Sequence, residues 1–528
     1  MRFATFGDSR VRRLATTRRS IMGAAMAGAA AMAMPGFVNA AGEKVLRVRS
    51  NSDIQGIDPN NPAAAADQDV MMAIFNKLVG FKPGTEWDWQ LEAAEEIEVV
   101  TPTDVKFRLM PNIMWTDGYG ELTTEDVKYS FERLGKLESW AAVDWSTLDH
   151  VEIVDKYNGI IHLNAPFAPL FRSTLPYGSG SIVCKKAVEE LPEKIFTTTP
   201  PAQSGPYKIR SWDQRQKLVL ERHDGWPGKK PYFDVIEVYP IEDEKAAEIA
   251  YEAGDLDMTM IAISSVPQFE ANLPPNTNMM VRPPLQYEWI GMNVDHPPFD
   301  DERVRRAIQL AINVDEIIAA AFFGVAERAT GIIAPGLIGH RDSNIHNEPD
   351  LEKARALLAE AGLADGFDAT LSVQSTTDKT AVAQVIQANL AEIGINVEIL
   401  AMDSGTFWTL GIESEGDSWK DLQMIYNNYS MAPDPFWATA WFVPEQVGEW
   451  NWERWNSPEF GAMHEAAVAE IDPQKRHEMY VKMQDMMEES SAYIFVTHGV
   501  NAFLYRDNLI PALSPSGESY LFRDFSAT

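Results

Sequence analysis

The alternation of apolar and polar positions near the middle of the chain predicts a β-rich segment that ends in a helix. Residues 207–212 and 217–222 are short β-rich runs joined by four polar residues, a pattern typical of a hairpin. A third strand is predicted over residues 234–239. Residues 244–251 then have the spacing of a short helix, which Gly254 ends.

The same patterns predict mixed α/β structure on both sides of this segment. Residues 105–109 alternate as a strand does, and Thr123 or Thr124 caps a helix with acidic residues in its first turn. Further on, Asn313 and Glu316 have the spacing of a capping box. A strand over 370–374, a helix whose apolar positions run from 382 to 393, and a strand over 395–399 together predict a βαβ unit.

The first 40 residues have the pattern of an export signal. Arg18 and Arg19 precede an apolar run that is shorter than the ~20 residues of a membrane span. The twin arginines indicate the Tat route, and small residues predict cleavage between Ala40 and Ala41. With no cysteine near that site, we expect a soluble periplasmic protein without a lipid anchor.

Charge and cysteine content exclude some classes of partner and site. The formal net charge is −32, and residues 1–40 carry six arginines and one aspartate, so the rest of the chain carries −37. Such a chain repels nucleic acid and anionic lipid, and we expect neither as a partner. Cys184 is the single cysteine, so no intramolecular disulfide can form. A length of 528 residues predicts two or three domains.

Five separated sequence blocks between residues 204 and 258 resemble a known family. In order they read GPY, SWD, LVLERHDGW, KPYFDVIEV and AYEAGDLDM. At this spacing they resemble the extracytoplasmic solute-binding proteins of family 5, the peptide- and nickel-type receptors of ABC importers. Blocks before and after this segment are also similar, so the resemblance covers nearly all of the mature chain.

This resemblance implies an α/β, two-lobed periplasmic-binding-protein fold, type II-like, with an extra small domain inserted in the first lobe. Residues 43–88, 204–285 and 501–528 would form lobe I, 89–203 the inserted domain, and 286–500 a Trp-rich lobe II that faces the ligand. The implied mechanism is hinge closure on a solute, followed by delivery to ABC permease subunits in the inner membrane. We expect a monomer that has no cofactor and is not an enzyme.

Tryptophan density points to the ligand site. Residues 406–455 hold seven of the 15 tryptophans, in a segment rich in Gly, Asn, Asp and Pro. Core packing accounts for several of them, but aromatic faces with a few polar groups are also typical of a small-molecule pocket.

Residues 426–439 match the family's pocket loop. Where peptide binders commonly have an Asp for the peptide's amino group, this chain has Tyr429, and where they often have an Arg for the carboxylate it has Gln374, Ser375 and Thr376. Both charge partners are therefore expected to be absent, with Asp434 either a substitute acid or a turn residue. The candidate ligand-binding residues are Ile54, Gln55, Tyr287, Trp289, Gln374, Ser375, Trp408, Asn427, Asn428, Tyr429, Asp434 and Trp437.

Several functions remain open on these grounds. The first hypothesis is capture of a peptide or peptide-like solute; the alternatives are an oligosaccharide, an opine-like or a cationic solute, or a sensor that feeds a chemoreceptor. An exported hydrolase would need a nucleophile with a base or paired carboxylates, and the sequence has no such motif. The acids and histidine of residues 295–301 could bind a metal, but a polar loop before a helix explains them better, so no metal is expected.

Overall fold

The computed structural model describes residues 42–60, 65–136, 141–346 and 348–528. The predicted signal peptide, with Arg18, Arg19 and the cleavage site at Ala40 and Ala41, lies outside these residues. Within the described ranges, no helix combines the length and apolar character that a membrane span requires.

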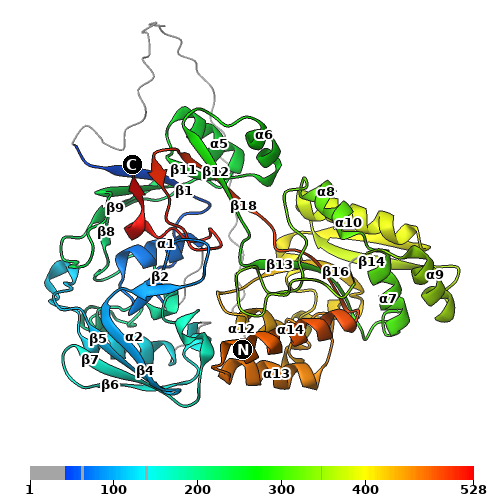
Figure 1. Ribbon diagram of the computed structural model, residues 1–528, viewed down its shortest axis with the longest axis horizontal. Coiled ribbons are helices and arrows are strands. Elements are labelled where there is room, and N and C mark those ends of the chain that lie inside the picture. The colour runs from blue at the N-terminus through cyan, green and yellow to red at the C-terminus, as the bar shows by residue number, and fades with distance from the viewer. Residues whose placement is uncertain (1–41, 61–64, 137–140, 347) are drawn as a thin grey trace, which may run out of the picture. The chain divides into compact units, whose positions relative to one another are not determined.

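The largest sheet joins strands from distant parts of the sequence (Figure 1). In spatial order its strands are β12 (Thr277–Arg282), β18 (Asn501–Arg506), β11 (Met258–Ile261), β1 (Val45–Ser50), β10 (Val235–Pro240), β9 (Lys217–Arg222) and β8 (Tyr207–Asp213). The predicted hairpin is confirmed as the antiparallel pair β8 and β9, and the predicted third strand as β10. The helices of this region are α1 (Ala65–Ile74), α5 (Glu244–Ala253) and α6 (Val266–Ala271).

A second, antiparallel sheet occupies the region expected to be the inserted domain. Its strands lie in the order β4 (Ala94–Thr101), β5 (Asp104–Leu109), β7 (Asn158–Leu163) and β6 (Leu148–Ile153). The capping box of α2 (Thr124–Leu134) is formed by Thr123 and Asp126. Two short helices, α3 (Ala141–Asp144) and α4 (Lys185–Glu189), follow along the chain. Strands β2 (Val79–Phe81) and β3 (Trp89–Leu91) form an antiparallel pair that spans the expected boundary between residues 88 and 89. The position of that domain boundary stays a prediction.

The third sheet carries half of the candidate ligand residues on its strands. Its strands lie in the order β15 (Ile395–Met402), β14 (Phe367–Gln374), β16 (Met424–Ser430), β13 (Gln286–Met292) and β17 (Tyr493–Thr497). The predicted βαβ unit is confirmed, because β14 and β15 are parallel and α10 (Thr377–Ala391) connects them. Asn313 caps α8 (Val314–Ala321) as expected, but Glu316 accepts a hydrogen bond from Asn389. The remaining helices of the third-sheet region are α7 (Glu302–Ala311), α9 (Leu351–Glu360), α11 (Ser404–Phe407), α12 (Phe436–Thr439), α13 (Pro458–Ala469) and α14 (Pro473–Glu489).

The chain crosses between the first and third sheets at two neighbouring places. One crossing runs from β12 to β13 and the other from β17 to β18, and these strands pair as β12 with β18 and β13 with β17. Gly499 lies in the second crossing with a φ of +78°, a conformation that favours glycine. Two short connections that lie side by side are what a hinge between two lobes requires. Strands β19 (Leu509–Ile510) and β20 (Ser526–Ala527) then form a small pair near the C-terminus.

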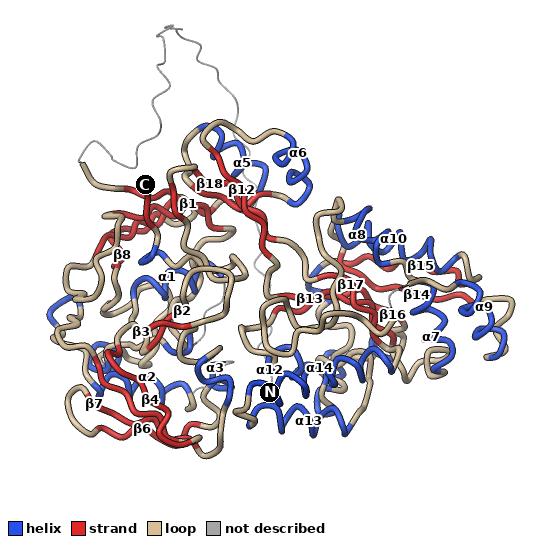
Figure 2. Tube along the Cα trace, viewed as in Figure 1, coloured by secondary structure: helices blue, strands red, loops and turns tan. Residues whose placement is uncertain are grey.

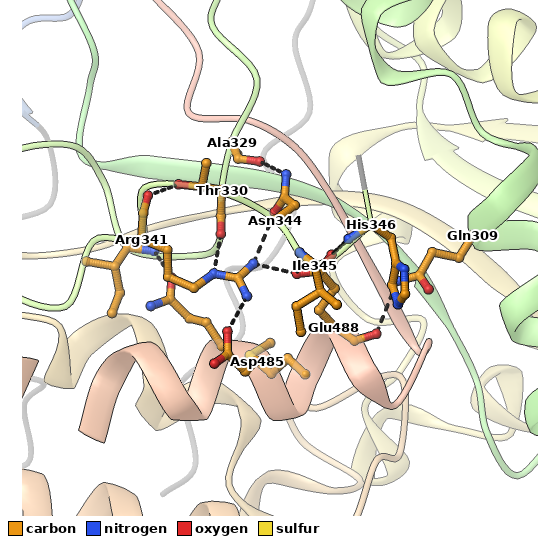
Figure 3. Close-up of polar contacts among 12 residues, drawn as sticks. Gln309, Ala329, Thr330, Arg341, Asn344, Ile345, His346, Asp485 and Glu488 are labelled. Atoms are coloured by element: carbon orange, nitrogen blue, oxygen red, sulfur yellow. Dashed lines mark hydrogen bonds and ion pairs between the residues drawn. The ribbon is translucent and has the colours of Figure 1, made fainter. Parts of the chain in front are cut away.

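An ionic network around the buried side chain of Arg341 fixes a long loop against α14 (Figure 3). Arg341 pairs with Asp485 and Glu488, each at 2.7 Å, and its side chain is 3% exposed. Glu488 also accepts hydrogen bonds from the backbone N–H groups of Ile345 and His346. The same helix packs against α13 (Figure 2), so α14 connects this loop to a second helix of the region.

Candidate ligand-binding site

Four aromatic rings surround a pocket at the end of β16. The pocket has a volume of about 310 Å³ and is lined by Trp408, Asn428, Tyr429, Ser430, Trp441 and Trp450. Strand β16 places Asn428, Tyr429 and Ser430, and Trp408 follows directly after α11. Trp441 lies in a short 3-10 helix over residues 440–442. A pocket of this size is at the lower end of the range for ligand sites and suits one side chain or ring.

The rings contact one another at steep angles and so form walls rather than a flat stack. Tyr429 lies 6.2 Å from Trp450 at 81° and 5.8 Å from Trp441 at 56°, measured between ring centroids and planes. Trp441 and Trp450 meet at 5.8 Å and 70°. Only Trp408 is nearly parallel to Tyr429, at 6.1 Å and 23°. Aromatic rings favour such edge-to-face packing, which holds these walls in place.

Tyr429 is the centre of this arrangement. It is 7% exposed, and its hydroxyl donates to the backbone carbonyl of Trp450 at 2.7 Å. That bond ties the pocket's strand to the segment that carries its far wall. Burial raises the pKa of Tyr429 well above its ordinary value, so the hydroxyl stays protonated and can keep this donor role.

Trp289 and Tyr287 pack against the ring of Tyr429 and do not line the pocket. Trp289 is buried and lies 4.8 Å from Tyr429, and its indole N–H donates to Glu453 at 2.7 Å. Tyr287 is also buried and donates to the carbonyl of Ala438 at 3.2 Å. Both stand on β13, which pairs with β16, and this pairing explains why they share the aromatic cluster.

Asp434 is fully buried and holds the pocket loop to α14. Both of its oxygens accept hydrogen bonds from the Arg476 guanidinium, each at 2.7 Å, and Oδ1 also caps Phe436 N. The Arg476 side chain is 4% exposed. This geometry favours a structural role for Asp434 over contact with a ligand's amino group.

The other candidates do not line the pocket. Trp437 is partly buried on α12, contacts Trp441 at 6.4 Å, and lies near Asp144 of α3. Gln374 ends β14 and Ser375 is exposed beyond it. Ile54 is buried, and Gln55 is exposed with its backbone N–H bonded to Asp67. The structure therefore unites Trp408, Asn428 and Tyr429 in one pocket, with Asn427 next to them in β16.

Three pocket residues were absent from the candidate set. Trp441 and Trp450 belong to the dense tryptophan segment, so composition indicated them without selecting them. Ser430 had no signal of its own beyond its position next to Tyr429. A buried ion pair between Glu288 and Lys379, at 2.7 Å, was also unexpected, because these residues are far apart in the sequence.

The described part of the chain has no cluster of side chains suited to a metal ion near this pocket or elsewhere. Among residues 42–528, apart from the gaps at 61–64, 137–140 and 347, no three His, Cys, Asp or Glu side chains could hold a metal ion. Asp295 pairs with Arg454, and Asp301 caps α7. Cys184 is buried, and burial raises the pKa of its thiol to about 11, which disfavours a reactive thiolate.

Glu453 gives a pH-dependent prediction. Burial raises the pKa of its carboxyl to about 7, so the folded chain holds a proton that the unfolded chain loses near its ordinary value of 4.5. This group's contribution therefore lowers the free energy of unfolding as pH rises from about 4.5 to about 7, and it is constant above that window. We expect Glu453→Gln to gain stability relative to the parent chain across that window. Urea unfolding of both chains at several pH values measures the difference, and a difference that does not change with pH contradicts the assignment.

Comparison with known proteins agrees with this architecture. A family model described as bacterial extracellular solute-binding proteins, family 5 middle, matches residues 89–449. The dipeptide-binding protein of Escherichia coli K12 is 26% identical over 491 residues, covering 86% of this chain and 89% of that protein. The glutathione-binding protein of Salmonella paratyphi A is 28% identical over 362 residues, covering 66% and 68%.

A solved structure extends the comparison to the fold. The ABC transporter-associated periplasmic binding protein from Helicobacter pylori, solved with the peptide STSA, aligns with a TM-score of 0.75 at 22% identity, covering 92% of this chain and 98% of that one. The two-lobed periplasmic-binding-protein fold expected from the sequence is thereby confirmed. The family match spans more than half of the sequence, and the chain belongs to the family 5 bacterial extracellular solute-binding proteins.

Proposed function

We propose that this protein is the periplasmic receptor of an ABC importer and captures a peptide longer than a dipeptide. The observation that carries the proposal is the aromatic pocket at the end of β16. The chain that forms this pocket belongs to a family of solute-binding proteins. Relatives named for binding a dipeptide and glutathione support a peptide as the solute. We further propose export through the predicted Tat signal, a monomeric mature chain, partnership with membrane permease subunits, and no enzymatic turnover.

The proposed length of the peptide follows from charge. A dipeptide zwitterion held between two lobes needs a partner for each terminal charge, because an unpaired buried charge costs several kcal/mol. The resemblance to the family implies that Tyr429 stands at the position of the amino-group acid, and Asp434 is buried against Arg476. A longer peptide can instead be held by backbone hydrogen bonds and by one side chain in the pocket.

The proposed receptor function is tested by ligand affinity and by closure of the two lobes on binding. The two neighbouring crossings between sheets support a hinge at this place, and a ligand that contacts both lobes would favour the closed state. We expect tetrapeptides to bind the mature chain with micromolar affinity, about −8 kcal/mol, and to lower its radius of gyration. Calorimetry measures the first and solution X-ray scattering the second. Tight binding of free dipeptides would contradict the charge argument, and unchanged scattering at saturation would contradict closure.

A further inference from the structure

None of the six side chains that line the aromatic pocket carries a charge at neutral pH. Four of them are aromatic, and the two others, Asn428 and Ser430, are polar but neutral. The hydroxyl of Tyr429 stays protonated because burial raises its pKa, and it donates to the carbonyl of Trp450. The pocket therefore presents mainly aromatic carbon to whatever occupies it.

Two buried carboxylates on neighbouring segments do not line the pocket. Glu453 follows Trp450 in the chain and accepts the indole N–H of Trp289 at 2.7 Å. Glu288 is 4% exposed and pairs with Lys379 at 2.7 Å, so its charge is already balanced within the protein. A charged side chain that entered the pocket would lose part of its hydration and meet no partner of opposite charge among the lining residues.

The walls of the pocket pack against further rings that do not line it. Between ring centroids, Trp408 lies 5.5 Å from Phe407 and 6.0 Å from Trp452, and Trp441 lies 6.4 Å from Trp437. Trp452 is 1% exposed. Closely packed side chains resist rearrangement, so the pocket has a fixed shape and cannot widen easily to admit a hydrated group.

We infer that this pocket selects an uncharged apolar side chain of the captured peptide, aliphatic or aromatic, over a side chain that carries a full charge. The inference names the ligand chemistry of the proposed function and rests on it. Each methylene that moves from water onto these aromatic faces strengthens binding by about three- to four-fold. The volume of about 310 Å³ limits this gain, because a side chain that is too large would strain the walls.

A cationic head group is the alternative that aromatic rings also attract. At a partly exposed site, a cation over an aromatic face gains about as much as one buried methylene. Loss of its hydration costs more than this unless a carboxylate pairs with it. Because none of the six lining residues is acidic, the lining favours the neutral guest.

Small probes test the pocket on the full mature chain without assuming a peptide. Binding of toluene, benzylamine and tetramethylammonium at neutral pH is followed by tryptophan fluorescence and checked by NMR. Benzylamine is protonated under these conditions and adds one charged group to the ring of toluene. We expect toluene to bind about ten-fold more tightly than either cation, or better. A smaller ratio, tighter binding of a cation, or no binding of toluene overturns the inference.

A matched pair of variants ties the preference to this pocket. Ser430 lines the pocket and is exposed at the end of β16, so a larger side chain there does not disturb a buried core. Ser430→Asp adds a carboxylate to the lining, and Ser430→Asn adds the same bulk without the charge. Melting curves check that both variants are folded.

The two variants are compared with tetrapeptides that carry norleucine or ornithine. These side chains have the same length, and an ammonium group in ornithine replaces the terminal methyl group of norleucine. Ser430→Asp is expected to lower the norleucine-to-ornithine affinity ratio by about three- to five-fold relative to Ser430→Asn, as an exposed ion pair would. An equal ratio in the two variants overturns the assignment to this pocket. If Ser430→Asp is unfolded, the peptide comparison on the parent chain still decides.

The parent chain separates this inference from the function on which it rests. Alanine tetrapeptides with norleucine or ornithine at each position in turn are titrated by calorimetry. At one position, we expect norleucine to bind about ten-fold more tightly than ornithine, or better. Binding of all peptides without this preference at any position overturns the inference and leaves the peptide function standing. Failure of every tetrapeptide, with toluene still bound, overturns the peptide function and leaves the apolar selectivity of the pocket.

Discussion

Asp434→Ala is expected to lower the free energy of unfolding by about 3–5 kcal/mol, the usual cost of leaving one member of a buried ion pair alone. Asp434 is fully buried and binds the Arg476 guanidinium through two hydrogen bonds of 2.7 Å. Burial acts to lower the pKa of Arg476, but the charge and hydrogen bonds of Asp434 outweigh it and the pKa is raised. Without Asp434, the guanidinium would remain charged in a buried position with Tyr480 beside it.

Urea unfolding measures this loss, and a surface pair serves as the control. Glu459 of α13 pairs with Lys482 of α14 at 3.0 Å, and both side chains are more than half exposed. Glu459→Ala should therefore leave the unfolding midpoint nearly unchanged. A chain with Asp434→Ala that keeps its stability but no longer binds tetrapeptides would show that this acid serves the ligand instead of the loop.

Tyr429→Ala is expected to destabilise the chain by about 3–5 kcal/mol, as truncation of other buried aromatic residues does. Its ring contacts Trp289, Trp408, Trp441 and Trp450, so removal opens a cavity in the wall of the pocket. At a temperature where the variant is still folded, the affinity for a bound tetrapeptide should fall by about 1–3 kcal/mol, because one apolar wall is lost.

Tyr429→Phe separates the ring from the hydroxyl. This variant keeps the aromatic contacts and loses the hydrogen bond to the Trp450 carbonyl, so its stability should fall by about 1 kcal/mol. Thermal unfolding and calorimetric titration of the two variants give the comparison. If the affinity of Tyr429→Ala for every tetrapeptide equals that of the parent chain, the ligand lies elsewhere and the proposed site is wrong.

Elements fixed by neighbouring residues could be predicted from the sequence. The hairpin of β8 and β9, the helix cap at Thr123, and the unit of β14, α10 and β15 depend on patterns within a few residues or on short connections. Helix caps and strand alternation act over such distances, so their signal survives without tertiary information. The ordered sequence blocks between residues 204 and 258 indicated the family, and the family implied the two-lobed fold.

The membership of the site was decided by tertiary structure. The tryptophan-rich segment marked the region, but the sequence could not select Trp441 and Trp450 over Trp437 as pocket walls. Asp434 meets Arg476 from 42 positions away, and Trp289 meets Glu453 from 164 positions away. Only sheet pairing and helix packing bring such residues together. Periodicity and capping report local conformation, whereas the burial and partner of a side chain depend on segments that are distant in the sequence.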